Sequence, residues 1–183
     1  MATNITYDEE KFKELIVYIA AKSDDDAYFG DVKLNKLLFY SDFLAYAYFG
    51  KPITGAEYQK QTHGPIATRL LPVRRQLIEA GDVDIVQRNR FYRQRVTVNR
   101  REPNTRLFDT DQIDLVDELL RVFENADAST LSSFTHENEV GWQLMALGEQ
   151  IPYETVFLLP PDQTPQAALD WAYSVVHERN LAA

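Results

Sequence analysis

The sequence predicts a mostly helical (α+β) fold with a small antiparallel β part. Several segments repeat apolar residues at helical spacing behind a capping residue, and short β-rich runs flank a turn between residues 83 and 98. The chain has 183 residues, of which 45% are hydrophobic, which is enough to bury one core. We therefore expect a single domain over residues 1–183.

The first two helices are predicted to form the centre of the core. Thr6 begins a capping-box pattern, and apolar residues follow at helical spacing over residues 12–20. A second helix is expected over residues 32–49, with Asp31 as its N-cap and Gly50 at its end. Its apolar residues cover nearly the whole circumference, so this helix should be buried on most sides.

The β part is expected in two places. Residues 56–62 form one candidate strand, and His63-Gly64-Pro65 turns the chain into a third helix that ends before Gly81. Pro72 must either kink that helix or lie in its first turn. Residues 83–98 predict a β-hairpin. The β part of the fold is therefore expected to be either a hairpin alone or a three-stranded sheet.

The second half of the chain is predicted to be helical. A capping box at Asp109 starts one helix, Ser129 caps a short one, and Thr164-Pro165 opens the last. Residues 139–147 remain ambiguous, because Gly141 weakens a helix there. The order of elements resembles a winged-helix core extended by helices, which is an analogy of fold only.

Charge is distributed unevenly along the sequence. Residues 61–108 hold 10 basic and 4 acidic side chains, whereas residues 109–183 hold 2 basic and 14 acidic ones. The net charge of −9 argues against broad binding of a phosphate backbone, with the middle third as the exception. The absence of cysteine and of a signal-peptide pattern favours a cytoplasmic protein, and no apolar run is long enough to predict a membrane span.

Motifs for cofactors and metals are missing. Neither a phosphate-binding glycine loop nor a dinucleotide-binding turn is present, and no cofactor is expected. His63, His136 and His177 lack ligand spacing, and the acidic run 24–26 lacks the calcium-loop pattern. We therefore expect no metal site, and a solvated loop at residues 24–26.

Hydroxyl side chains beside His136 leave a hydrolase as a remote alternative. They belong to Ser132, Ser133 and Thr135, but neighbouring positions on a helix point in different directions. Local capping and core contacts are the preferred interpretation for these residues, and for the His63 turn. Trp142 and Trp171 are interpreted as core anchors.

The predicted hairpin is rich in arginine and has an aromatic tip. Such a hairpin could contact DNA or RNA as a wing, or pair with the acidic final third within the chain or in a homodimer. The residues concerned are Arg88, Arg90, Phe91, Tyr92, Arg93 and Arg95.

Four stretches together resemble a known family. They are Lys33-Leu34-Asn35-Lys36-Leu37-Leu38-Phe39-Tyr40-Ser41-Asp42, the following Gly50-Lys51-Pro52-Ile53, the turn His63-Gly64-Pro65-Ile66, and Leu131-Ser132-x-x-Thr135-His136 with Trp142 beyond. In this order they are similar to the Panacea domain, the SocA-like antitoxin domain of bacteria and phages. The resemblance spans roughly residues 30 to 157, and the chain departs from the pattern at Phe39, where tyrosine is common.

The resemblance implies a non-enzymatic antitoxin that neutralises a co-encoded protein toxin by direct contact. An adaptor role toward an AAA+ protease is also known in the family. No catalytic residues carry over, and the motif residues are interpreted as mainly structural: Lys36, Tyr40, Asp42, Gly64, Pro65, His136 and Trp142.

Two hypotheses follow. In the first, acids of the final third face a basic toxin, because opposite charge speeds encounter. The acids expected there are Asp114, Asp117, Glu118, Glu137 and Glu139. In the second, the chain is a winged-helix DNA-binding regulator that uses the arginine-rich hairpin.

Overall fold

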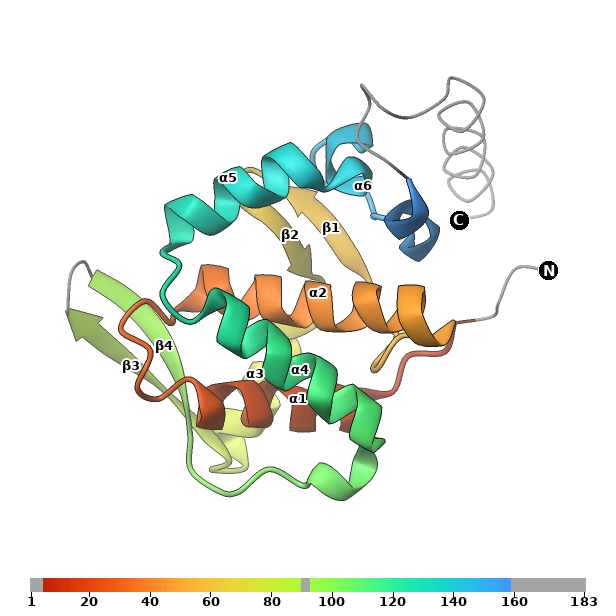
Figure 1. Cartoon of the computed structure of the whole chain (residues 1–183). Helices are drawn as coiled ribbons and strands as arrows, with labels where there is room; N and C mark the ends of the chain where they lie inside the picture. The colour runs from red at the N-terminus through yellow and green to blue at the C-terminus, as the bar shows by residue number, and fades with distance from the viewer. Residues whose placement is uncertain (1–4, 90–92, 159–183) are drawn as a thin grey trace.

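The computed structural model describes residues 5–89 and 93–158 and confirms a mostly helical fold with a small β part (Figure 1). The elements in chain order are α1 (Glu9–Lys22), α2 (Asp31–Phe49), β1 (Tyr58–Gln61), β2 (Gly64–Ala67), α3 (Leu70–Glu79), β3 (Val83–Asn89), β4 (Arg93–Asn99), η1 (Thr105–Leu107), α4 (Thr110–Phe123), α5 (Ala128–Asn138), α6 (Val140–Leu144) and η2 (Tyr153–Phe157). The predicted last helix, Trp171 and His177 lie outside the described residues.

Helix α2 is the centre of the core, as its apolar circumference predicts. It contacts α1, α4, α5, β2, β4 and η2, and Figure 1 shows it between α5 and the β1–β2 hairpin on one side and α1 and α4 on the other. Gly50 ends α2 with φ of 73°, a left-handed conformation that glycine adopts without strain.

The capping box predicted at Thr6 is wrong. Asp8 caps α1 instead, because its side chain accepts a hydrogen bond from the backbone N–H of Lys11 at 3.0 Å. The backbone N–H of Asp8 in turn donates to the carbonyl of Thr54 at 2.8 Å. That tertiary contact holds the preceding chain extended, so the helix cannot begin earlier.

Two other caps also differ from prediction. Asp127, rather than Ser129, caps α5 by accepting from the N–H of Thr130 at 2.7 Å. Helix α2 has Gly30 as its N-cap, so Asp31 is already its first residue. The capping box at Asp109 is confirmed.

The strands form two antiparallel hairpins that stay separate within the described residues, so no three-stranded sheet is formed there. In β1–β2, Tyr58 lies opposite Ala67, and in β3–β4, Val83 lies opposite Asn99. Pro72 lies in the first turn of α3, where its missing N–H has no intrahelical partner to lose.

The ambiguous segment after α5 contains the short helix α6. Gly141 is required there by a close approach, because a Cβ on it would overlap the Thr155 hydroxyl of η2. Among the described residues, no helix combines the length and apolar character needed to cross a membrane.

Candidate functional site

Three motif residues that lie far apart in the sequence meet beneath the β1–β2 turn. Lys36 of α2 donates from Nζ to the carbonyl of His63 at 3.1 Å and to the hydroxyl of Thr135 on α5 at 2.8 Å. Gly64 passes directly over this ammonium, and a Cβ on Gly64 would overlap Nζ. Lys36 therefore joins α2, the turn and α5, and we call Lys36, Gly64 and Thr135 the lysine joint.

Lys36 is unusual because it is buried without a close counterion. Its side chain is 1% exposed, and within the described residues no carboxylate oxygen lies within 4.0 Å of Nζ. Burial lowers the pKa of Lys36 to about 8, while the carboxylate of Glu139 acts in the opposite direction.

Tyr40 and Glu139 complete the surroundings of the joint. The Thr135 hydroxyl donates to the carbonyl of Leu131 at 2.9 Å, so it can only accept from Lys36 and from Tyr40, whose oxygen lies 3.3 Å away. Burial raises the pKa of Glu139, while its interactions with Tyr40 and Lys36 act in the opposite direction. The cluster thus satisfies its polar groups internally.

Replacing Gly64 with alanine is expected to lower the free energy of unfolding by about 2 kcal/mol or more. The φ of Gly64 is 120°, a conformation that side chains rarely adopt and that is strained by about 1–3 kcal/mol. The new methyl group would also displace the Lys36 ammonium. Urea unfolding measures the loss.

Gly148→Ala is the matched control for that experiment. Gly148 also has a positive φ, of 86°, but open space surrounds its Cβ position. Equal losses in the two variants would contradict a specific fit of Gly64 over Lys36.

Asp42 forms a second buried polar centre on α2. Its carboxyl group is 0% exposed and accepts from the Thr54 N–H at 2.6 Å and the Thr54 hydroxyl at 2.5 Å. The Tyr58 hydroxyl lies 2.8 Å from both Asp42 and the carbonyl of Leu38. Burial raises the pKa of Asp42. These contacts fasten the chain between α2 and β1 to the helix.

His136 and Trp142 stack beside the end of β1. Their ring centroids are 4.0 Å apart, and the Lys60 ammonium lies 4.3 Å from the Trp142 ring centroid. The Trp142 indole N–H donates to the carbonyl of Gln61 at 3.1 Å, so Trp142 joins α6 to β1. Burial lowers the pKa of His136.

The hydroxyls near His136 are used locally. Ser132 donates to the carbonyl of His63 at 3.1 Å, as Thr135 does to Leu131, while Ser133 is exposed. The Thr135 bond is local and the Ser132 bond joins α5 to the β1–β2 turn, which supports capping and core contacts over a nucleophile.

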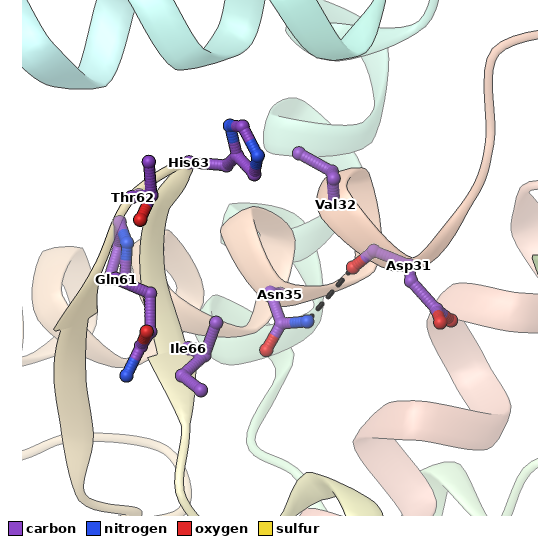
Figure 2. Close-up of a pocket in the computed structure, with 9 residues that line it drawn as sticks. Asp31, Val32, Asn35, Gln61, Thr62, His63 and Ile66 are labelled. Carbon is purple, nitrogen blue, oxygen red and sulfur yellow. Dashed lines mark hydrogen bonds between the residues drawn. The ribbon is translucent and has the colours of Figure 1, made fainter. Parts of the chain in front are cut away.

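A cavity of about 300 Å³ lies between the β1–β2 turn and the start of α2. Figure 2 shows His63, from the β1–β2 turn, pointing toward Val32 of α2, with Asn35 and Ile66 also in the lining. The Asn35 amide donates to the carbonyl of Asp31 and accepts from the N–H of Ala67. No group of three or more metal-ligating side chains occurs in the part of the chain that the structure describes.

The basic hairpin pairs with acids that the sequence did not indicate. Arg88 binds Asp24 at 2.5 Å, and Arg95 lies 3.9 Å from Asp31. For these described side chains, pairing with the acidic final third of the same chain, one of the alternatives, is therefore wrong. Arg90, Phe91 and Tyr92 lie outside the described residues, as does the side chain of Arg93, whose backbone begins β4.

The loop before α2 is only partly solvated, which corrects the prediction for residues 24–26. Asp26 binds the buried Lys33 ammonium at 2.6 Å, and Lys33 also donates to the carbonyls of Phe123 and Glu124 at the end of α4. The sequence pattern does not predict this contact. Its one signal is a second lysine, three residues before Lys36, on a largely apolar helix.

The predicted toxin-facing acids lie in different settings. Asp114 and Glu118 are exposed one turn apart on α4, and Glu137 is exposed on α5. Asp117 accepts from the Tyr18 hydroxyl at 2.6 Å. Glu139 instead interacts with Tyr40 and Lys36 inside the cluster.

The comparison with protein families gives one match. The model described as "Antitoxin SocA-like, Panacea domain" matches residues 34–143, from α2 to α6, and so includes the lysine joint and Asp42. No curated protein and no solved structure matches the chain.

Proposed function

The chain belongs to the SocA-like Panacea domain family, and from this premise we propose that it is a non-enzymatic antitoxin that neutralises a co-encoded protein toxin by direct binding. The family match over residues 34–143 carries the proposal. The motif residues support a non-enzymatic role, because Lys36, Asp42 and Gly64 are buried and hold neighbouring elements together. We propose that it acts in the cytoplasm with its toxin.

We propose further that Asp114 and Glu118 of α4 belong to the toxin-binding face, with Glu137 on α5. Asp114 and Glu118 are four residues apart and exposed, so they point to the same side of α4. Opposite charge on a partner would steer its approach. Asp117 and Glu139 are left out, because each is half-buried and interacts with a side chain of the core. Glu118 pairs with Arg121 of the same helix but remains exposed.

A DNA-binding role is not favoured by the hairpin. Arg88, Arg100 and Arg101 are paired with acids of the same chain, which reduces the positive charge available to phosphates.

Co-expression with the neighbouring toxin gene tests the proposal. We expect growth to be rescued and the two proteins to copurify. If growth is rescued while the toxin level falls, and deletion of an AAA+ protease restores the toxin level, the adaptor mechanism would be indicated. Neither rescue nor copurification would contradict antitoxin function.

Charge reversal tests the proposed face. Asp114→Lys/Glu118→Lys should slow association on the order of tenfold at low salt, with a smaller effect at high salt. Glu79→Lys/Glu102→Lys is the matched control, because it changes net charge equally at exposed positions outside α4. Equal slowing in both variants would assign the effect to net charge alone.

A further inference from the structure

Three exposed aromatic side chains lie at the carboxyl end of α2 and on η2, which packs against α2. Tyr48, Phe49 and Phe157 are 71%, 39% and 61% exposed, and we call them the aromatic patch. The rings of Tyr48 and Phe49 are 6.4 Å apart, and Phe157 of η2 lies 5.8 Å from Tyr46. Tyr46 and Phe49 are three residues apart and lie on the same side of α2, which brings Phe157 to the same region.

The patch continues a buried aromatic series outward. Tyr153 stacks on Phe43 at 4.5 Å and lies 5.6 Å from Tyr46, which contacts Phe157. Phe157 is the exposed end of this series. Neighbouring exposed aromatics, unlike single ones, indicate a surface that another apolar group covers.

The chain itself supplies the nearest candidate. The structure describes residues as far as Leu158, one residue beyond Phe157, and residues 159–183 continue from that point. Their sequence places Ala168, Ala172 and Val176 at helical spacing, with Trp171 next to them. A segment tethered beside a surface meets it at a high effective concentration, on the order of millimolar for short linkers.

We propose that residues 159–183 dock through their apolar side chains on the aromatic patch of the same chain, completing one domain. Tyr48 and Phe49 lie within the matched residues 34–143, whereas Phe157 and the docking segment lie beyond them. The inference does not depend on toxin binding.

Trp171 is a natural reporter, because Trp142→Phe leaves it as the only tryptophan. In the folded full-length variant, we expect Trp171 emission at a shorter wavelength than in denaturant. Adding Tyr48→Ser and Phe157→Ser should abolish this blue shift. Leu71→Ser is the matched control, because Leu71 is 65% exposed on α3, and it should leave the emission unchanged.

Several outcomes would overturn the proposal. These are emission already at the denatured wavelength, a blue shift that persists after both serine substitutions, and a shift that depends on protein concentration. The last would assign the patch to a second copy of the chain. If Trp142→Phe does not fold, the wild-type spectrum minus that of Trp171→Phe gives the same readout.

Discussion

Replacing Asp42 with alanine is expected to lower the free energy of unfolding by about 2–6 kcal/mol, because two buried donors lose their acceptor. The substitution leaves the Thr54 N–H and the Thr54 hydroxyl without their acceptor, whereas the Tyr58 hydroxyl keeps the carbonyl of Leu38 at 2.8 Å. Each buried donor without a partner is unfavourable by about 1–3 kcal/mol. Urea unfolding followed by circular dichroism measures the loss.

Two variants separate the causes of that loss. Asp42→Asn keeps the volume and one acceptor, so its loss should be smaller than that of Asp42→Ala. Asp114→Ala removes an exposed carboxylate and should stay within about 0.5 kcal/mol of the wild type. A loss below about 1 kcal/mol for Asp42→Ala would show that other groups hold the α2–β1 connection.

The centre of the fold could be predicted because it is encoded locally. The apolar circumference of α2 indicates a buried helix in any context, and Gly50 supplies the left-handed residue that ends it. The caps of α1 and α5 were predicted less well, since several adjacent residues can cap a helix. At α1, the contact of Asp8 with Thr54 decides among them.

The candidate site could not be predicted, because its contacts are distant in the sequence. Lys36 is 27 residues from His63 and 99 from Thr135, and helical spacing carries no information about either partner. The hairpin shows the same limit. Opposite net charge suggested the final third as partner, but the fold places Asp24 beside Arg88.

Lys36→Met is expected to abolish a rise in stability with pH that the wild type shows between about pH 8 and 10. Unfolded lysine keeps its proton up to a pKa near 10.5, whereas folded Lys36 releases it near a pKa of about 8. Between these values the unfolded state binds more protons, so the free energy of unfolding rises with pH. At about 1.4 kcal/mol per pH unit, the full difference is at most about 3 kcal/mol.

The groups around Lys36 set the limits of the measurement. Burial raises the pKa of Tyr40 and Tyr58, so above pH 10 the folded state retains protons that unfolded tyrosine releases, which opposes the lysine effect. Burial lowers the pKa of His136, so His136 titrates below the window, whereas burial raises the pKa of Glu139. Subtracting the Lys36→Met curve from the wild-type curve removes contributions common to both proteins.

Urea unfolding at several pH values from 7 to 10 gives this difference. Lys51→Met is the control, because Lys51 is exposed and its substitution should leave the pH dependence intact. If the free energy of unfolding has the same pH dependence in the wild type and in Lys36→Met, then Lys36 keeps its proton in the folded state. The ammonium would in that case be better solvated or paired than its geometry indicates. A rise confined to the wild type and Lys51→Met would establish that the lysine joint holds α2, the β1–β2 turn and α5 together through an ammonium that folding disfavours.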